Sequence, residues 1–146
     1  MNSTEMIEEN CRTASEVKAG QFGKEEFALI DKIKGYINET MKVNCTGCRY
    51  CMPCPKGVDI PAIFSAYNHI YSANKGRGIE DYFHTVAIRR EPADANLCIG
   101  CGKCEKHCPQ NINIREMLKK ADKELRPFPF NIAFKAARRI MIGKKK

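Results

Sequence analysis

Nine cysteines stand among the 146 residues, and eight of them form two dense runs. The second run consists of Cys98, Cys101, Cys104 and Cys108, followed directly by Pro109. This is the spacing with which bacterial-type chains bind 4Fe-4S clusters through cysteine thiolates. The first run consists of Cys45, Cys48, Cys51 and Cys54, followed directly by Pro55, and it has one residue fewer before its last cysteine. Both runs are therefore predicted to bind iron–sulfur clusters, whose chemistry is the transfer of single electrons.

In this motif the cysteine before proline binds the other cluster of a two-cluster protein, so the ligand sets cross between the runs. The ligand set that we predict for one 4Fe-4S cluster is Cys45, Cys48, Cys51 and Cys108. The set that we predict for the other is Cys98, Cys101, Cys104 and Cys54. The shorter first run makes Cys54 the ligand that departs most from the regular spacing.

Zinc is the alternative metal for these cysteines. Structural zinc sites usually take paired Cys-x2-Cys units separated by a longer loop, whereas here four cysteines follow each other in one run. The alternative function is accordingly a zinc-stabilised interaction module whose basic tail binds an acidic partner. Cys11 stands alone in an acidic segment and is interpreted as a bystander rather than a ligand.

Charge and hydropathy limit the cellular location and the classes of partner that we expect for the chain. No segment approaches the roughly 18–20 consecutive apolar residues of a membrane-spanning helix, and the N-terminal segment is acidic without an apolar signal core. We therefore expect a cytoplasmic protein with reduced cysteines. The formal charge is +8, but eight thiolates around two oxidised clusters of about +2 each would lower it to about +4. Nucleic acid is therefore not an expected partner.

The apolar residues recur with helical spacing in several segments, and none alternates as a strand would. Helices are expected over about 24–41, 60–71, 79–86 and 114–125, with Asp59 and Asn113 as N-caps and Glu116 completing a capping box with Asn113. The sequence Gly76-Arg77-Gly78 predicts a turn. The fold class is thus mostly α: a helical ferredoxin-like domain with two cysteine-rich loops between helices.

An internal repeat links the two runs, because the first three cysteines of each run share one constant offset. Each run also ends in Cys-Pro before a capped helix, which predicts a pseudo-twofold core. The predicted organisation is a helical lead-in over 1–44, a two-cluster domain over 45–125 and a basic tail over 126–146. The tail carries seven basic and no acidic residues, and Phe130, Phe134, Ala137 and Met141 share one helical face. We favour packing of this helix on its own domain, and docking on a membrane surface or an acidic partner is the alternative.

The segments VNCTGCRYCMPCPKGVDIPAIFSAYN and CIGCGKCEKHCPQNINIREMLKK resemble the C-terminal iron–sulfur domain of a prokaryotic aldo/keto reductase family. In that family an NADPH-dependent TIM barrel precedes this domain. A barrel needs roughly 250 residues, and only 44 precede the first cysteine run here. The resemblance therefore implies the iron–sulfur part of an oxidoreductase, as a fragment, a split subunit or a free-standing ferredoxin. It implies a redox partner protein, such as a separate aldo/keto reductase barrel, and no catalytic residue in this chain.

Overall fold

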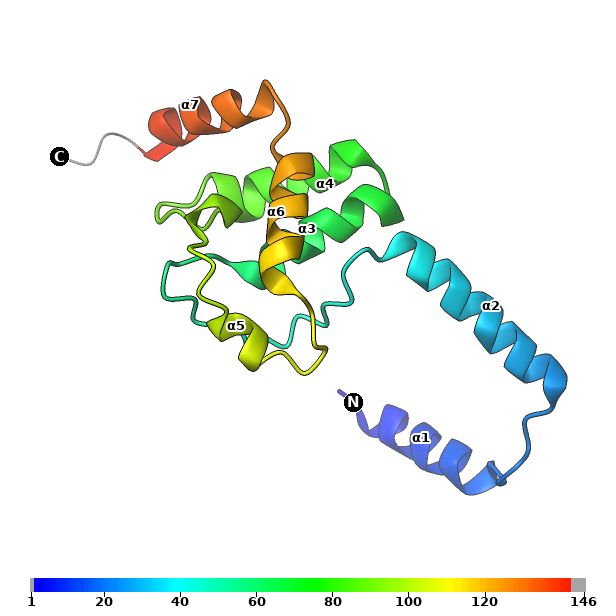
Figure 1. The fold of residues 1–146 in the computed structure, drawn as a ribbon. Helices are drawn as coiled ribbons and strands as arrows, with labels where there is room; N and C mark the ends of the chain where they lie inside the picture. The colour runs from blue at the N-terminus through cyan, green and yellow to red at the C-terminus, as the bar shows by residue number, and fades with distance from the viewer. Residues whose placement is uncertain (1, 143–146) are drawn as a thin grey trace. The chain divides into compact units, whose positions relative to one another are not determined.

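The structure is a computed structural model that describes residues 2–142, except the side chain of residue 142. Two compact units divide the chain, Met1–Ile37 and Asn38–Lys146. Helices and loops make up the described residues, and no strand occurs in this part of the chain. The predicted mostly α fold class is therefore confirmed (Figure 1). Within residues 2–142, none of the helices combines the length and the apolar character that crossing a membrane requires.

The first unit contains α1 (Thr4–Glu16) and most of α2 (Lys24–Thr40). Ser3 caps α1, because its hydroxyl oxygen accepts a hydrogen bond from the Met6 N–H at 3.3 Å. Helix α2 confirms the helix predicted over 24–41. Neither helix contains a buried residue.

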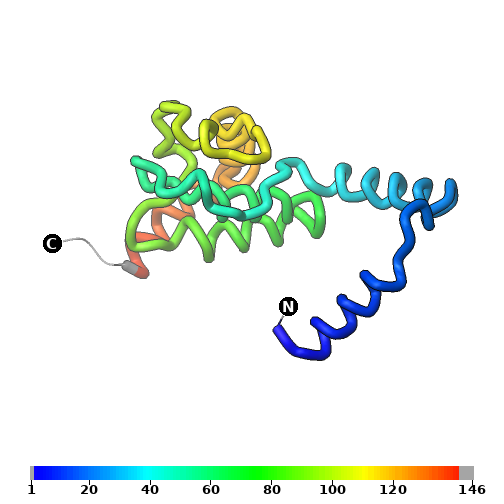
Figure 2. The backbone as a smooth tube through the Cα atoms, turned by 90° about the horizontal axis from the view of Figure 1, so that it is seen from below, coloured from blue at the N-terminus to red at the C-terminus, as the bar shows by residue number. Residues whose placement is uncertain are grey.

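The second unit carries all eight cysteines of the two runs. Its helices are α3 (Ile60–Ser72), α4 (Lys75–Tyr82), α5 (Lys103–Lys106), α6 (Ile114–Leu125) and α7 (Phe130–Ile142). A π-helical turn (Phe83–Ala87) continues α4, and a 3-10 turn (Ala95–Leu97) precedes the second cysteine run. Helix α3 packs against α4 and α6, and α7 packs against the π-helical turn (Figures 1 and 2).

Helix α3 forms the centre of the core and begins where the sequence predicts. Ile60, Ile63 and Phe64 are fully buried on it. The carboxylate of Asp59 caps the helix by accepting a hydrogen bond from the Ala62 N–H at 3.4 Å. Asp59 is itself buried, and its charge is compensated by Arg89 at 2.8 Å. The helix that follows the first cysteine run is thus fixed at its N-terminus, next to the run.

The start of α6 differs in detail from the predicted capping box. The helix begins at Ile114 as expected, but the Asn113 side chain makes no hydrogen bond to the backbone of the first turn. Its amide donates to the Glu116 carboxylate at 2.9 Å instead. The two predicted residues therefore pair with each other rather than with the helix N–H groups.

The prediction of a turn at Gly76-Arg77-Gly78 is wrong. These residues lie inside α4, which Asn74 caps by accepting a hydrogen bond from the Arg77 N–H at 2.9 Å. The physical reason lies in the packing of α3 on α4. A Cβ atom at Gly78 would lie 2.5 Å from Ile70 Cγ1 and 2.7 Å from the Ala66 carbonyl oxygen. Gly78 therefore serves the close approach of two helices and not a chain reversal.

The variant Gly78→Ala should be destabilised by about 1–3 kcal/mol, because the added methyl group would force α3 and α4 apart. Gly76→Ala is the matched control in the same helix, since its Cβ would meet only the end of the Asn74 side chain, at 3.3 Å. We expect the control to stay within about 1 kcal/mol of the natural protein. Anaerobic thermal unfolding followed by circular dichroism measures both, and equal stability of the two variants would contradict the packing role of Gly78.

Candidate iron–sulfur cluster site

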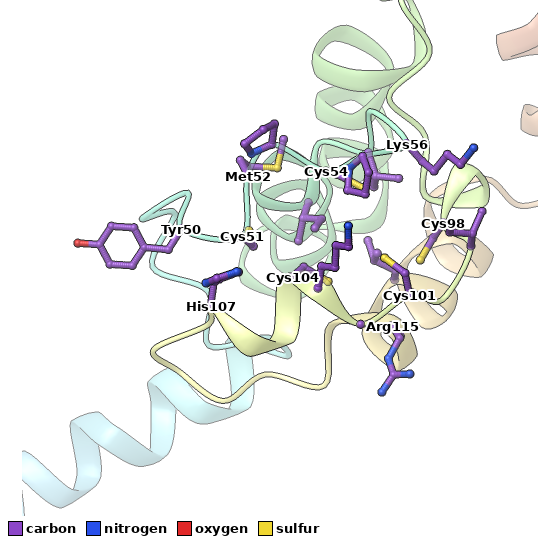
Figure 3. Close-up of a pocket in the computed structure, with 18 residues that line it drawn as sticks. Tyr50, Cys51, Met52, Cys54, Lys56, Cys98, Cys101, Cys104, His107 and Arg115 are labelled. Carbon is purple, nitrogen blue, oxygen red and sulfur yellow. The ribbon is translucent and has the colours of Figure 1, made fainter.

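The two cysteine runs form the walls of two adjoining cavities in the second unit. The larger cavity, about 300 Å³, is lined by cysteines of both runs, namely Cys51, Cys54, Cys98, Cys101 and Cys104 (Figure 3). The smaller, about 20 Å³, is lined by Cys45, Cys48, Cys51 and Cys108. Cys51 and Ile60 line both cavities and so form their common wall. The last cysteine of each run thus lies with the first three cysteines of the other run.

The thiols are close enough to influence one another. Burial raises the pKa of Cys45, and the nearby Cys48 and Cys108 raise it further. Burial also raises the pKa of Cys51 to about 11, and the nearby Cys45 and Cys104 raise it further. Without a metal these thiols stay protonated at neutral pH, so metal binding must release their protons.

The backbone of the two runs shares the same unusual conformations at equivalent places. Gly47 and Gly100 precede the second cysteine of their runs, and both have φ near +70°. The Cys-Pro ends also match, because the Gly57 N–H donates to the Cys54 carbonyl at 2.9 Å and the Asn111 N–H donates to the Cys108 carbonyl at 3.1 Å. Both turns lead directly into a helix, α3 or α6. The pseudo-twofold relation of the two halves stays a prediction.

The runs differ where the second has its extra residue. Helix α5, a single turn, lies between Cys101 and Cys108 and contains Cys104. The first run has no helix at the corresponding place. The extra residue is thus accommodated by one helical turn, which ends with the Cys108 N–H donating to the Glu105 carbonyl at 3.2 Å.

A buried asparagine anchors the chain just before the first run. The Asn68 side chain on α3 accepts a hydrogen bond from the Val43 N–H at 3.0 Å and donates one to the Val43 carbonyl at 2.8 Å. Both residues are buried. The carbonyl of Val43 also accepts from the Cys45 N–H at 2.7 Å. One amide side chain therefore fixes the segment that positions Cys45, two residues before that cysteine.

An arginine at the start of α6 anchors the second run. Arg115 forms two charge-assisted hydrogen bonds to Glu105 of α5, from Nε at 2.9 Å and from a terminal nitrogen at 2.8 Å. Its other terminal nitrogen donates to the Gly100 carbonyl at 3.4 Å. These hydrogen bonds lower the pKa of Glu105 and keep it ionised. Arg115 thus connects α5, the cysteine loop and α6.

A buried carboxylate holds the segment before Cys98. Asp94 accepts a hydrogen bond from the Tyr82 hydroxyl at 3.1 Å and pairs with Arg138 of α7 at 3.1 Å. Its backbone carbonyl accepts from the Leu97 N–H at 3.2 Å, in the turn that leads into the second run. Local sequence patterns do not reveal the roles of Asn68, Arg115 and Asp94, because their partners are distant along the chain. An asparagine within the otherwise apolar α3 pattern is the one hint.

The donor set and its surroundings fit an iron–sulfur cluster. The two side chains that line both cavities, Cys51 and Ile60, are a thiol and an apolar group. No carboxylate of the described chain lines either cavity. Thiolates in a partly apolar setting are the ligands that 4Fe-4S clusters take. Residues 44–112 match the family model of a 4Fe-4S dicluster domain.

The match supports a ferredoxin-type domain that binds 4Fe-4S clusters over these residues. The match spans both cysteine runs with α3 and α4 between them, and ends just before α6. No curated protein and no solved structure matches the chain. The anchoring residues Arg115 and Arg138 therefore lie beyond the matched segment, although they hold its loops.

Several further residues around the larger cavity, and the ninth cysteine, have more ordinary surroundings. Tyr50 and Ile99 line the larger cavity, yet they are 67% and 64% exposed, so they form its rim rather than a buried shell. His107 also lines it and is exposed. Cys11 is exposed on α1, in the other unit.

Replacing the buried Asn68 tests whether the anchor on Val43 positions the first run. Asn68→Ala leaves the buried Val43 N–H without its partner and removes one of the two hydrogen bonds to the Val43 carbonyl, which should cost about 1–3 kcal/mol. We expect faster release of iron to a chelator from the anaerobically purified variant, followed by the loss of visible absorbance. The exposed Asn96→Ala is the control and should release iron at the natural rate. An unchanged rate in Asn68→Ala would contradict the anchoring role.

Proposed function

We propose that this chain is an electron-transfer module that binds two 4Fe-4S clusters. Cys45, Cys48, Cys51 and Cys108 hold one cluster, and Cys98, Cys101, Cys104 and Cys54 hold the other. The observation that carries the proposal is the grouping of the eight cysteines around two cavities, each lined by cysteines of both runs. When bound, such clusters supply reversible one-electron chemistry.

The protein's own side chains determine how the two sites communicate. Cys51 and Ile60 line both cavities, so the two sites are direct neighbours. The larger cavity opens at the exposed Tyr50 and Ile99, and the ammonium groups of Lys56 and Lys103 lie at its walls. This side is the one at which electrons enter or leave the module.

The reaction in which the electrons are used takes place on another protein or domain. We assign no acid–base or nucleophilic residue here, and four cysteine ligands at each site leave no open iron position for a substrate. The resemblance to the iron–sulfur domain of aldo/keto reductases supports a place in an oxidoreductase of that type. Its redox partner is then a TIM-barrel reductase, on a separate chain or on a longer form of this one, in the cytoplasm.

A zinc-stabilised interaction module is the second candidate function, and the geometry favours it less. Zinc needs four ligands within about 2.3 Å of one point. Among residues 2–142, no three His, Cys, Asp or Glu side chains converge in that way. The cysteines line two cavities with shared walls instead, and a cluster takes its thiolates at separate iron atoms rather than at one point.

Combined cysteine variants test the crossed ligand sets. Cys45→Ala with Cys48→Ala should remove one site and leave about four irons and four sulfides per chain. Adding Cys108→Ala should then change nothing, because that thiol belongs to the site already lost. Adding Cys54→Ala should instead remove the remaining iron. Iron and acid-labile sulfide analysis after anaerobic purification gives the counts.

The mirror-image set is the control for misfolding. Starting from Cys98→Ala with Cys101→Ala, Cys54→Ala should be neutral and Cys108→Ala should remove the remaining iron. Iron loss with the opposite pairing in both sets would show that each run binds its own cluster. Zinc without sulfide in the natural protein would replace the electron-transfer function by the zinc alternative.

A further inference from the structure

Helix α7 has one side that belongs to the core of the second unit. Phe134 is 8% exposed and packs against Phe83, with ring centres 5.4 Å apart. Arg138, one turn further along, pairs with the buried Asp94 and donates to the Val86 carbonyl at 3.3 Å. The predicted packing of the tail on its own domain therefore holds for this side, as Figure 1 shows for α7 beside the helices of the second unit. Residues 143–146 lie outside the described part of the chain.

The opposite side of α7 is apolar as well, although nothing in the described chain covers it. Ile132, Ala136 and Ile140 follow one another at intervals of four residues, so they lie on one face. Ile132 is 59% exposed and Ile140 is 83% exposed, and Phe128, just before the helix, is 79% exposed. We call Phe128, Ile132, Ala136 and Ile140 the outer face of α7.

This outer face continues into a shallow apolar groove between α4 and α7. The groove, about 490 Å³, is lined mainly by Ile79, Phe83, Phe130, Ala133 and Ala137. Ala133 and Ala137 directly follow Ile132 and Ala136 in sequence, and so lie beside them on the helix. Its one carboxylate, Glu80, is paired with Arg77 at 3.5 Å. The apolar surface is thus broader than one helical stripe, and such a surface on a protein usually contacts a partner.

The charges beside the outer face are positive and unpaired. Arg126 and Arg138 are used inside the protein, by Asp122 and Asp94. Lys135 and Arg139 are exposed on α7 and have no ion pair among the described residues. From residue 126 to 146 the sequence contains no Asp or Glu, and it ends in three lysines. A surface that meets this region must therefore offer negative charge together with an apolar layer.

We propose that the outer face of α7 docks on the surface of an anionic lipid bilayer. Ile132 and Ile140 would enter the boundary between headgroups and acyl chains, while Lys135 and Arg139 contact lipid phosphates. A bilayer fits better than an acidic protein groove, because the exposed face is flanked by cations and continuous with a broad apolar area. This inference does not depend on the proposed electron-transfer function, since it concerns the described side chains of α7 alone.

Flotation of the full, cluster-loaded chain with vesicles tests the proposal. We expect binding to phosphatidylcholine vesicles that contain about one third phosphatidylglycerol, and little binding to pure phosphatidylcholine. Ile132→Asp with Ile140→Asp should weaken binding at least tenfold, because two buried apolar contacts are replaced by charges. Leu29→Asp with Ile33→Asp, at similarly exposed positions of α2, is the matched control and should bind as the natural chain does.

The charged residues have their own matched pair of variants. Lys135→Gln with Arg139→Gln should weaken binding about fivefold per removed charge, whereas Lys119→Gln with Lys123→Gln on α6 should have a much smaller effect. Visible absorbance and circular dichroism confirm that each variant is folded and loaded. Absence of binding to anionic vesicles at low salt would overturn the proposal, as would equal losses in the α2 control. Self-association that the Ile132→Asp with Ile140→Asp variant abolishes, without vesicle binding, would assign the face to a second copy of the chain.

Discussion

The convergence of thiols from both cysteine runs around two adjoining cavities is the constraint on which the rest of the second unit depends. The runs are mostly loops, and loops alone cannot hold eight side chains in place. Each run is therefore followed by a helix that begins within a few residues of its last cysteine, α3 after the first and α6 after the second. These two helices pack on each other, so fixing one run also restrains the other.

The anchors outside the cysteine motifs follow the same logic. Asn68 holds the chain before the first run, Asp94 holds the chain before the second, and Arg115 holds the middle of the second. The polar side chains of all three form hydrogen bonds to partners on other elements. Such bonds cost less free energy than leaving the backbone groups of a buried loop without a partner. Asp94 also explains why α7 belongs to the cluster-binding unit, because Arg138 of α7 and Arg126 both pair with this buried carboxylate, at 3.1 Å and 3.8 Å.

Sequence reasoning succeeded where the signal was local. The cysteine spacing, the Asp59 cap and the helical recurrence of apolar residues in α3 and α6 each depend on residues a few positions apart. It failed where the role of a residue depends on contacts with residues that are distant in the sequence. Gly78 looks like a turn residue, yet its missing side chain lets α4 approach Ile70 on α3. Arg115 carried no signal, and Asn68 stood out only as a polar residue within the apolar α3 pattern. Nothing in a sequence shows that residue 115 meets Gly100 or that residue 68 meets Val43.

Whether the chain binds two 4Fe-4S clusters is decided by anaerobic purification followed by iron and acid-labile sulfide analysis, with spectra recorded before and after reduction by dithionite. We expect about eight irons and eight sulfides per chain, and a broad absorption near 400 nm that bleaches on reduction. A colourless protein that contains zinc and no sulfide would contradict it. About four irons would contradict the two-cluster part of the account alone and direct attention to the shorter first run with Cys54.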